Sequence, residues 1–294
     1  MVIAIGPQAD NFGSWHWIGQ DLVDELGPER AVVFRDGIPR CDVVVFIKFK
    51  PSLAQLKALK PSRKLVYCPV DIYGSGTEID ADWESLRQFD CIICHAASLQ
   101  KYFSAYSRTA LLDHHVKFTA PMPTERRTDG PILWTGNAAN LPPLVEWCNA
   151  NQLPEELWVL TNLDRDNVTP SDLGFRGNNR IRIENWSPEK HREWAGLARL
   201  AMDIKGADFR ARHKPPTKAF DCIASGLPFA MNADSGPAAE IASRGFQLAT
   251  PVDWEFWSSR EYWEQTQQFG LQLNNTLSRP QIAHRLIEIL ESLP

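Results

Sequence analysis

The feature that most constrains this sequence is one stretch, 212–250, and above all its first 25 residues, 212–236. It opens with a basic segment that contains two prolines, Arg212-His213-Lys214-Pro215-Pro216. A short helical pattern follows over 217–224, and Ser225-Gly226 ends it in the usual manner of a helix C-terminus. A short apolar strand over 229–231 and a polar turn come next. A loop, helix, strand and turn in so little chain predict a unit of a parallel α/β domain.

Positive charge gathers where that helix begins. Helix N-termini carry partial positive charge and N–H groups without helical partners, and both favour a phosphate group. Arg212, Lys214 and Lys218 add three cations at the same end. Lys218 and Asp221 are three residues apart, so they share one face of the helix. The sequence therefore predicts an anion site at this end.

The stretch resembles the nucleotide-sugar glycosyltransferases of the GT-B fold, in the large retaining family called glycosyl transferases group 1. Two acidic positions of that family, eight residues apart, fall here on His213 and Asp221. The other matching parts are Lys218, the turn at 224–228, the strand at 229–232, and the turn Asp234-Ser235-Gly236 with Glu240 beyond it. A generic connection in any doubly wound domain is the alternative reading of the same pattern.

The length allows two domains, since 294 residues amount to two units of about 150 residues each. A strand, a glycine-bearing loop and a helix follow one another near residue 2 and again near residue 131, which is how a Rossmann-like unit begins. The polar segment between these units has the composition of a linker. We expect an N-terminal acceptor domain at 1–118, a linker at 119–130, a C-terminal donor domain at 131–275, and a last helix at 276–294 that packs back towards the N-terminal domain.

These patterns and the resemblance together predict an α/β chain with two Rossmann-like domains facing across a cleft, the GT-B fold. The loop after the first strand is not a G-x-G-x-x-G fingerprint, so the sequence gives little support for dinucleotide binding. We assign its residues Gly13 and Ser14 to the acceptor side.

Asp71 ends a predicted strand at 65–71, and ligands gather at the carboxyl ends of strands in open parallel sheets. It is therefore our candidate base if the enzyme inverts configuration. A turn or helix cap is the more common role of such an aspartate. The segment that follows, 72–82, contains Gly74 and Gly76 and is predicted to be an exposed loop.

The resemblance implies the remaining site residues. The family's acid at the position of Asp221 binds ribose or sugar hydroxyls, and the loop at Gly136 and Asn137 lies near the donor phosphates. Trp186 follows a strand whose loop touches the nucleotide base in the family. The other donor-side positions are His213, Ser235 and Gly236. Lys218 with Arg212 would stabilise the departing diphosphate, where negative charge develops.

Three patterns that suggest a metal have simpler interpretations. Cys91 and Cys94 are three apart on a strand, so they point to opposite faces and are expected in the core. The pair His114-His115 reads as turn residues, and the acidic triplet Asp164-Arg165-Asp166 as a surface loop. We expect no metal and no cofactor beyond the nucleotide-diphosphate sugar itself.

The formal net charge of −5 weighs against nonspecific binding to nucleic acid. No apolar run approaches the roughly 18 residues of a membrane span, and the first residues read as a strand rather than a signal peptide. Six cysteines in so long a chain do not form a disulfide framework and indicate a reducing cytoplasm. A lipid-linked acceptor would add peripheral association with a membrane; the oligomeric state is open.

The sequence thus predicts a metal-independent glycosyltransferase of the hexosyltransferase class. It would move a sugar from a nucleotide diphosphate to a saccharide or another hydroxyl acceptor, in polysaccharide biosynthesis. Two alternatives stay open at this point. One is a catalytically silent protein that binds a nucleotide sugar or acts as a scaffold. The other is a nucleotide-sugar epimerase on the same fold.

Overall fold

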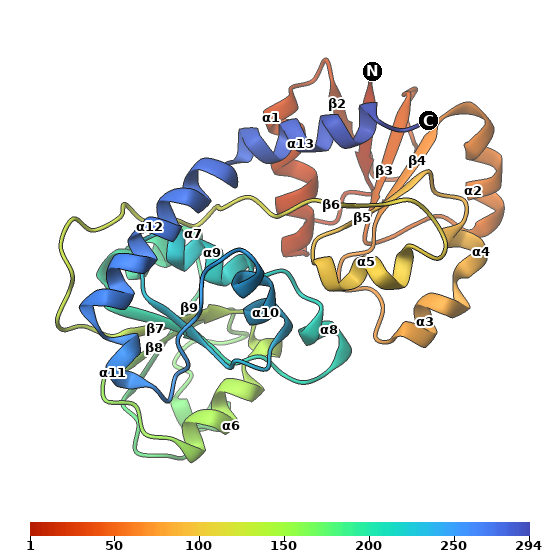
Figure 1. Ribbon diagram of the computed structural model, residues 1–294. Helices are drawn as coiled ribbons and strands as arrows, with labels where there is room; N and C mark the ends of the chain where they lie inside the picture. The colour runs from red at the N-terminus through yellow and green to blue at the C-terminus, as the bar shows by residue number, and fades with distance from the viewer. The chain divides into compact units, whose positions relative to one another are not determined.

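The computed structural model describes all residues, 1–294, and divides them into two compact units by their contacts (Figure 1). Unit 1 comprises Met1–His115, Asp208–Pro215 and Leu277–Pro294. Unit 2 comprises Val116–Ala207 and Pro216–Thr276. The segment Asp208–Pro215 lies within the range that the sequence assigns to the second domain, yet its contacts place it in unit 1.

Unit 1 is built on a six-stranded parallel sheet in the order β2-β1-β3-β4-β5-β6. Its strands are β1 (Ile3–Gly6), β2 (Ala31–Val33), β3 (Val43–Ile47), β4 (Lys64–Cys68), β5 (Cys91–Cys94) and β6 (Thr109–Leu111). The residues of β3 and β5 are buried along their whole length. Unbroken apolar runs are expected of parallel strands that are covered on both faces.

Helices of unit 1 follow most of its strands, but none lies between β2 and β3. They are η1 (Trp15–Gln20), α1 (Asp21–Leu26), α2 (Leu53–Leu59), η2 (Lys60–Ser62), α3 (Gly76–Ala81), α4 (Trp83–Leu86), α5 (Ala97–Phe103), α8 (Phe209–Arg212) and α13 (Arg279–Glu291). The last helix, α13, lies against α1 (Figure 1). An ion pair between Arg279 and Glu25, 2.8 Å long, joins the start of α13 to the end of α1.

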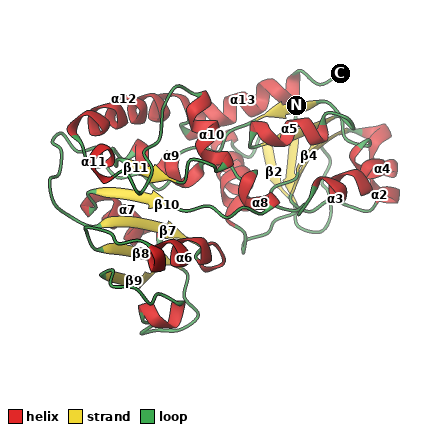
Figure 2. Cartoon of the chain, turned by 60° about the horizontal axis from the view of Figure 1, so that its bottom comes forward, coloured by secondary structure: helices red, strands yellow, loops and turns green.

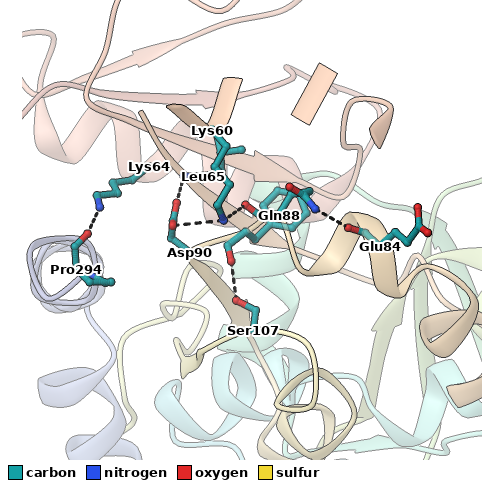
Figure 3. Close-up of polar contacts among 9 residues, drawn as sticks. Lys60, Lys64, Leu65, Glu84, Gln88, Asp90, Ser107 and Pro294 are labelled. Carbon is teal, nitrogen blue, oxygen red and sulfur yellow. Dashed lines mark hydrogen bonds and ion pairs between the residues drawn. The ribbon is translucent and has the colours of Figure 1, made fainter. Parts of the chain in front are cut away.

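Polar contacts tie together the amino ends of β4 and β5 (Figure 3). The Asp90 carboxylate accepts a hydrogen bond from the Leu65 amide at 2.8 Å and pairs with the Lys60 ammonium at 3.6 Å. Lys64, the first residue of β4, donates to the Pro294 carbonyl, so the end of the chain is held at the same edge. The side chains at this edge bind one another, and the candidate residues lie at the opposite, carboxyl edge.

Unit 2 has a five-stranded parallel sheet in the order β11-β10-β7-β8-β9, which Figure 2 shows side by side. The strands are β7 (Ile132–Gly136), β8 (Leu157–Thr161), β9 (Ile181–Asn185), β10 (Leu200–Asp203) and β11 (Phe229–Met231). The helices are η3 (Ala138–Asn140), α6 (Pro142–Ala150), η4 (Pro170–Leu173), α7 (Pro188–Leu197), α9 (Thr217–Ala224), α10 (Gly236–Ser243), α11 (Trp254–Trp257) and α12 (Arg260–Thr276).

The helix α9 and the strand β11 fall where the sequence predicts them. Gly226 adopts the left-handed backbone conformation, with a φ of 75°, and the Leu227 amide donates to the Cys222 carbonyl at 3.0 Å. That bond is the expected hydrogen bond of a helix end closed by glycine. The long helix α12 packs against α9, so the predicted key segment is covered within its own unit.

Two predictions for unit 1 are wrong in detail. The strand at 65–71 ends at Cys68, because Val70 and Asp71 already form a turn. The segment 72–82 is not a plain loop, since it contains helix α3, capped by the Ser75 side chain and anchored by the fully buried Ile79. None of the helices combines the length and the apolar character that a membrane span requires.

Candidate active site

The topology of unit 2 defines a place where a ligand is expected. Its first strand, β7, is flanked by β8 on one side and by β10 on the other, and the chain adds strands in both directions. Ligands of open α/β sheets bind at such a switch point, outside the carboxyl ends of the strands. Here β7 ends at Gly136 and β10 ends at Asp203. Lys218, in the first turn of α9, reaches the same point.

A buried aspartate holds two lysines at this switch point. Asp203 is only 1% exposed, and its carboxylate pairs with the Lys205 ammonium at 2.7 Å and with the Lys218 ammonium at 3.2 Å. Burial opposes the ionisation of Asp203, but the two lysines and the hydrogen bonds from Lys205 and Trp134 outweigh it and lower its pKa to about 2. Two cations share one anion, so the group carries one net positive charge at neutral pH.

Lys218 is positioned by its neighbours as well as by charge. Its ammonium lies over the Trp134 ring, 4.5 Å from the ring centroid, a favourable contact between a cation and an aromatic face. The Trp134 indole N–H donates to the other oxygen of Asp203 at 2.9 Å, which orients both groups. A Cβ atom at Gly136 would lie 2.5 Å from the Lys218 Nζ, so a glycine leaves the space that the ammonium occupies. The structure thus brings together Lys218 and Gly136, two of the predicted residues.

Sequence reasoning missed Asp203, Lys205 and Trp134. A signal for the first two was present, because Asp203 ends an apolar strand in the same way as Asp71 and directly precedes the key stretch. The rule about carboxyl ends of parallel strands applies to both positions. Trp134 is fully buried, so it is a core residue as well as a site residue. Its sequence pattern therefore shows only the first of these roles.

Asp221 has a different environment from the one that the resemblance implies. Its carboxylate is 2% exposed and accepts a hydrogen bond from the Lys117 amide at 2.8 Å. One turn later the Ser225 hydroxyl accepts from the Ala120 amide at 3.0 Å. Both hydrogen bonds hold the segment 117–120, at the start of unit 2, against the helix α9 and its C-terminal cap. The geometry therefore gives Asp221 a structural role, and its contact with ribose or sugar hydroxyls stays a prediction.

Trp186 lies half-buried just beyond the carboxyl end of β9. Its ring meets Phe118 edge to face, and its N–H donates to the Nδ1 atom of His191 at 3.3 Å. An indole N–H can only donate, so Nδ1 is the acceptor and His191 carries its proton on Nε2. Burial, with the charges of Arg192 and Lys218, lowers the pKa of His191 to about 4, so the ring is neutral at pH 7. Stacking of Trp186 on a base remains a prediction.

The other donor-side residues act as helix caps. The Asn137 side chain accepts from the Ala139 amide at 2.9 Å, and Ser235 accepts from the Ala238 amide at 3.3 Å. Gly236 is the first residue of α10, directly after its cap. Asn137 follows β7 and Ser235 follows β11, so both lie at the carboxyl edge of the sheet. Their part in binding a donor stays a prediction.

In unit 1 the equivalent switch point lies between β1 and β3. The chain adds β2 on one side of β1 and then β3 to β6 on the other side. The loop with Gly13 and Ser14 leaves β1 here, and Lys48 follows β3. Asp71, at the carboxyl end of the adjacent β4, is exposed and has a φ of 51°. Burial lowers the pKa of Lys48, against the opposing charge of Asp71, and Arg210 and Lys214 lower it further. Asp71 therefore lies in a basic neighbourhood.

The segment Asp208–Pro215 brings those two cations into unit 1. Phe209 and His213 both pack edge to face on Tyr102, with ring centroids 5.3 Å apart in each case. The Nδ1 atom of His213 donates to the Phe209 carbonyl at 2.7 Å. Arg212 is exposed at the end of α8. The structure thus groups His213 and Arg212 with unit 1 and Lys218 with unit 2. That all three serve one donor site stays a prediction.

The paired histidines are buried, which corrects their interpretation as turn residues. His115 bonds to the Asp21 carboxylate at 3.0 Å, and His114 packs on His95 with ring centroids 4.7 Å apart. Burial lowers the pKa of His95 to about 4. Cys91 and Cys94 are buried with free thiols. No group of three or more His, Cys, Asp or Glu side chains is arranged to hold a metal ion.

Comparisons of sequence find no relative. No family model matches the chain. No curated protein matches it either.

Comparison of structures does find similar proteins. AviGT4, a glycosyltransferase involved in avilamycin A biosynthesis, gives a TM-score of 0.63 at 12% identity, over 100% of this chain and 98% of that one. Sucrose-phosphate synthase from Thermosynechococcus elongatus gives 0.67 at 12% identity, over 99% of this chain and 98% of that one. A trehalose-6-phosphate synthase gives 0.59 at 11% identity, over 86% of this chain and 74% of that one.

These similarities define the class of the protein by its fold. The chain has two parallel-sheet α/β units and shares the GT-B fold of these glycosyltransferases, as the resemblance in its sequence predicted. At identities near 12%, this structural similarity shows the fold alone and leaves the reaction to be argued from the site. The placement of the two units across a cleft stays a prediction.

Proposed function

We propose that this chain is a glycosyltransferase of the hexosyltransferase class that uses a nucleotide-diphosphate sugar as donor. The observation that carries the proposal is the cluster of Lys218, Lys205 and Asp203 at the switch point of unit 2. A fixed excess of positive charge beside a helix N-terminus suits a diphosphate. The acceptor would be a saccharide, free or lipid-linked, or another hydroxyl compound bound by unit 1.

In the proposed reaction the bond between the sugar C1 and the diphosphate oxygen breaks, and the acceptor oxygen forms the new bond to C1. Negative charge develops on the departing diphosphate, and Lys218 and Lys205 would stabilise it there. Because these cations are already ordered by Asp203 and Trp134, they need little rearrangement as the charge grows. With this charge supplied by side chains, we propose a metal-independent reaction, which activity in excess EDTA would test.

The acceptor hydroxyl must also lose its proton. If the configuration at C1 is inverted, Asp71 is the proposed base, because it is exposed at the carboxyl edge of the unit 1 sheet. If configuration is retained, the departing diphosphate can take the proton and no protein base is required. The stereochemistry of the product, read by NMR, separates the two cases.

The six cysteines are all free. Free thiols persist in reducing compartments. We therefore also propose that the reaction takes place in the cytoplasm, as a step in the assembly of a polysaccharide.

One observation favours a second candidate function. The residue at the position of a family acid, Asp221, is only 2% exposed and accepts a hydrogen bond from a backbone amide, so little of its carboxylate is open to a ligand. A protein that binds a nucleotide sugar without transferring it would have this arrangement. The assay below distinguishes the two candidates, because only the enzyme releases nucleoside diphosphate.

The test measures release of nucleoside diphosphate from UDP-, GDP-, ADP- and dTDP-sugars with a panel of saccharide acceptors. Lys218→Ala should lower the rate by about 100-fold or more, the usual effect of removing a group that stabilises developing charge. Arg244→Ala is the matched control. Arg244 is 23% exposed, pairs with Glu240 and lies over the Phe220 ring, as Lys218 is 24% exposed, pairs with Asp203 and lies over Trp134.

Equal losses in the two variants would contradict the assigned role of Lys218. Binding of a nucleotide sugar without any turnover would instead favour the second candidate. No binding and no turnover with any donor would reject both.

A further inference from the structure

Unit 1 contains a pocket that the proposed donor chemistry does not use. It has a volume of about 510 Å³ and lies between helix α2 and the segment 34–42. A pocket of this size suits a small molecule, since ligand sites usually measure about 300–1,000 Å³. All of its lining residues belong to unit 1.

The pocket has a simple origin in the chain. Strands β2 and β3 are parallel and both pair with β1, so the connection between them must cross β1. Such crossover connections usually have a dozen residues or more and usually contain a helix. Here the connection is only the nine residues 34–42, without a helix. A connection without a helix leaves room beside α2, and the pocket lies there.

The floor and the rim of the pocket are aromatic. Phe34 and Phe46 form the floor and meet edge to face, with centroids 6.0 Å apart. At the rim, Phe49 is 39% exposed and touches the 38% exposed Phe12, with centroids 5.5 Å apart. The Lys48 ammonium lies 4.6 Å from the centroid of the Phe12 ring.

The rim lies at the switch point of unit 1. Phe12 belongs to the loop after β1, and Phe49 follows β3, so their contact bridges the two diverging strands at their carboxyl ends. This is the edge at which ligands of open α/β sheets bind. The pocket therefore extends inward from the place where an acceptor is expected.

The basic side chains at the pocket have partners within the protein, and its one acidic side chain, Asp36, is exposed. Arg35 pairs with Asp10 at 3.1 Å, and Lys50 pairs with Asp82 at 3.0 Å. Arg63 donates to the Pro39 carbonyl and to the Ser62 hydroxyl. The side chains left to contact a ligand are mainly rings and aliphatic groups. This lining favours a neutral, flat, apolar group over a phosphate or a carboxylate.

We propose that this pocket binds a planar aromatic group of the acceptor, so that the acceptor is a phenol or an aryl glycoside. Aromatic rings pair favourably edge to face or offset-stacked. The exposed ring of Phe49 offers such a contact at the rim, and the buried rings of Phe34 and Phe46 give the pocket an apolar floor. The inference rests on the proposed function only in calling the ligand an acceptor. Binding of the ring is a property of unit 1 and can be measured without any donor.

The test uses 4-methylumbelliferone, a fluorescent phenol, and follows its polarisation as full-length protein is added. Ala58 lines the pocket from α2 and is exposed, so Ala58→Trp would fill the space from outside the core. Ala54, exposed on the same helix and outside the lining, provides the control Ala54→Trp. We expect Ala58→Trp to weaken binding by about tenfold or more and Ala54→Trp to leave it unchanged, since a filled pocket excludes the ring.

Phe49→Ala is the second variant, and it removes the rim ring without filling the pocket. Loss of one aromatic contact should weaken binding by about threefold to tenfold, a stacking energy of about 0.5–1.5 kcal/mol. The proposal is overturned if the wild type does not bind the phenol, or if Ala58→Trp and Ala54→Trp bind it equally. It is also overturned if the wild type self-associates in sedimentation and Ala58→Trp abolishes this self-association without weakening phenol binding. A second copy of the chain would then occupy the pocket.

The two proposals fail in different ways. If no nucleotide binds yet Ala58→Trp abolishes phenol binding, the pocket stands and the glycosyltransferase assignment falls. If Lys218-dependent transfer to saccharides is found but no phenol binds, the assignment stands and the aromatic acceptor is rejected.

Discussion

Gly136 makes room for Lys218: a Cβ atom at Gly136 would lie 2.5 Å from the Lys218 Nζ and 2.9 Å from the Trp134 ring. The two residues are 82 positions apart in sequence. They meet because β7 and α9 both reach the switch point of the unit 2 sheet. The absence of a side chain at one residue thus fixes where the charge of the other can lie.

Gly136→Ala should therefore displace the Lys218 ammonium and weaken binding of a nucleoside diphosphate by about tenfold, or 1.4 kcal/mol. The flexible end of the lysine can move, so the loss of folding stability should be small. Gly196→Ala is the control, because its added Cβ would meet only the Ala120 Cβ, at 3.9 Å. As a helical position it should gain up to about 1 kcal/mol of stability. Titration calorimetry that shows equal affinity in both variants would contradict the prediction.

Asp203→Asn should lower the free energy of unfolding by about 3 kcal/mol, the usual effect of removing one partner of a buried ion pair. Lys205 and Lys218 both lose their counter-charge, while the Trp134 N–H keeps an oxygen acceptor. Since the pKa of Asp203 falls to about 2 in the fold, below about 3.9 in an unfolded chain, its contribution is present above pH 3.9 and is lost towards pH 2. Urea unfolding at pH 7 measures the difference. A change in the free energy of unfolding below about 0.5 kcal/mol would be the size of an ordinary surface effect. It would contradict the role of Asp203 in holding the two lysines.

His95 and His191 should make the protein less stable as the pH falls from about 6.5 to about 4. Both have a pKa of about 4 in the fold because they are buried, against about 6.5 when unfolded. Between these values the unfolded chain binds more protons, so each histidine costs up to about 1.4 kcal/mol per pH unit. His95→Asn keeps a donor near the position of Nδ1 and does not titrate. It should flatten the pH dependence of urea unfolding by about one proton, whereas an unchanged slope would mean that His95 is charged in the fold.

Tyr102→Ala should release the segment Asp208–Pro215 from unit 1. The Tyr102 ring is the common partner of Phe209 and His213. Without it, amide exchange in this segment should become faster, because local opening no longer breaks two aromatic contacts. Tyr106→Phe is the control. Tyr106 is also on unit 1, and its hydroxyl bonds to Asp80. Mass-spectrometric exchange rates that are equal in Tyr102→Ala and the wild type would show that other contacts hold the segment.

Much of the fold could be predicted because its signals are local. The Ser225-Gly226 helix stop and the apolar run of β3 each depend on neighbours in sequence, and both are found in the structure. Helix α3 was missed because Gly74 and Gly76 suggest a loop. Its stability comes instead from the Ser75 cap and from burial of Ile79.

The site was predicted only in part, because its assembly depends on which strands become neighbours. Lys218 was identified from its place at a helix start, whereas its partner Asp203 becomes recognisable only once β10 lies beside β7. His213 and Asp221 were assigned from the resemblance alone. Their backbone partners, the Phe209 carbonyl and the Lys117 amide, leave no pattern in the sequence.

The central claim is that Lys218 belongs to a binding site for the diphosphate of a nucleotide sugar. Titration calorimetry of UDP, GDP, ADP and dTDP against the wild type, Lys218→Ala and Arg244→Ala tests it most directly. The account predicts that one nucleotide binds to the wild type and to Arg244→Ala with the same affinity, and about tenfold or more weakly to Lys218→Ala, a loss of about 1.4 kcal/mol. Equal affinity for Lys218→Ala, or no binding of any nucleotide to the wild type, would contradict it.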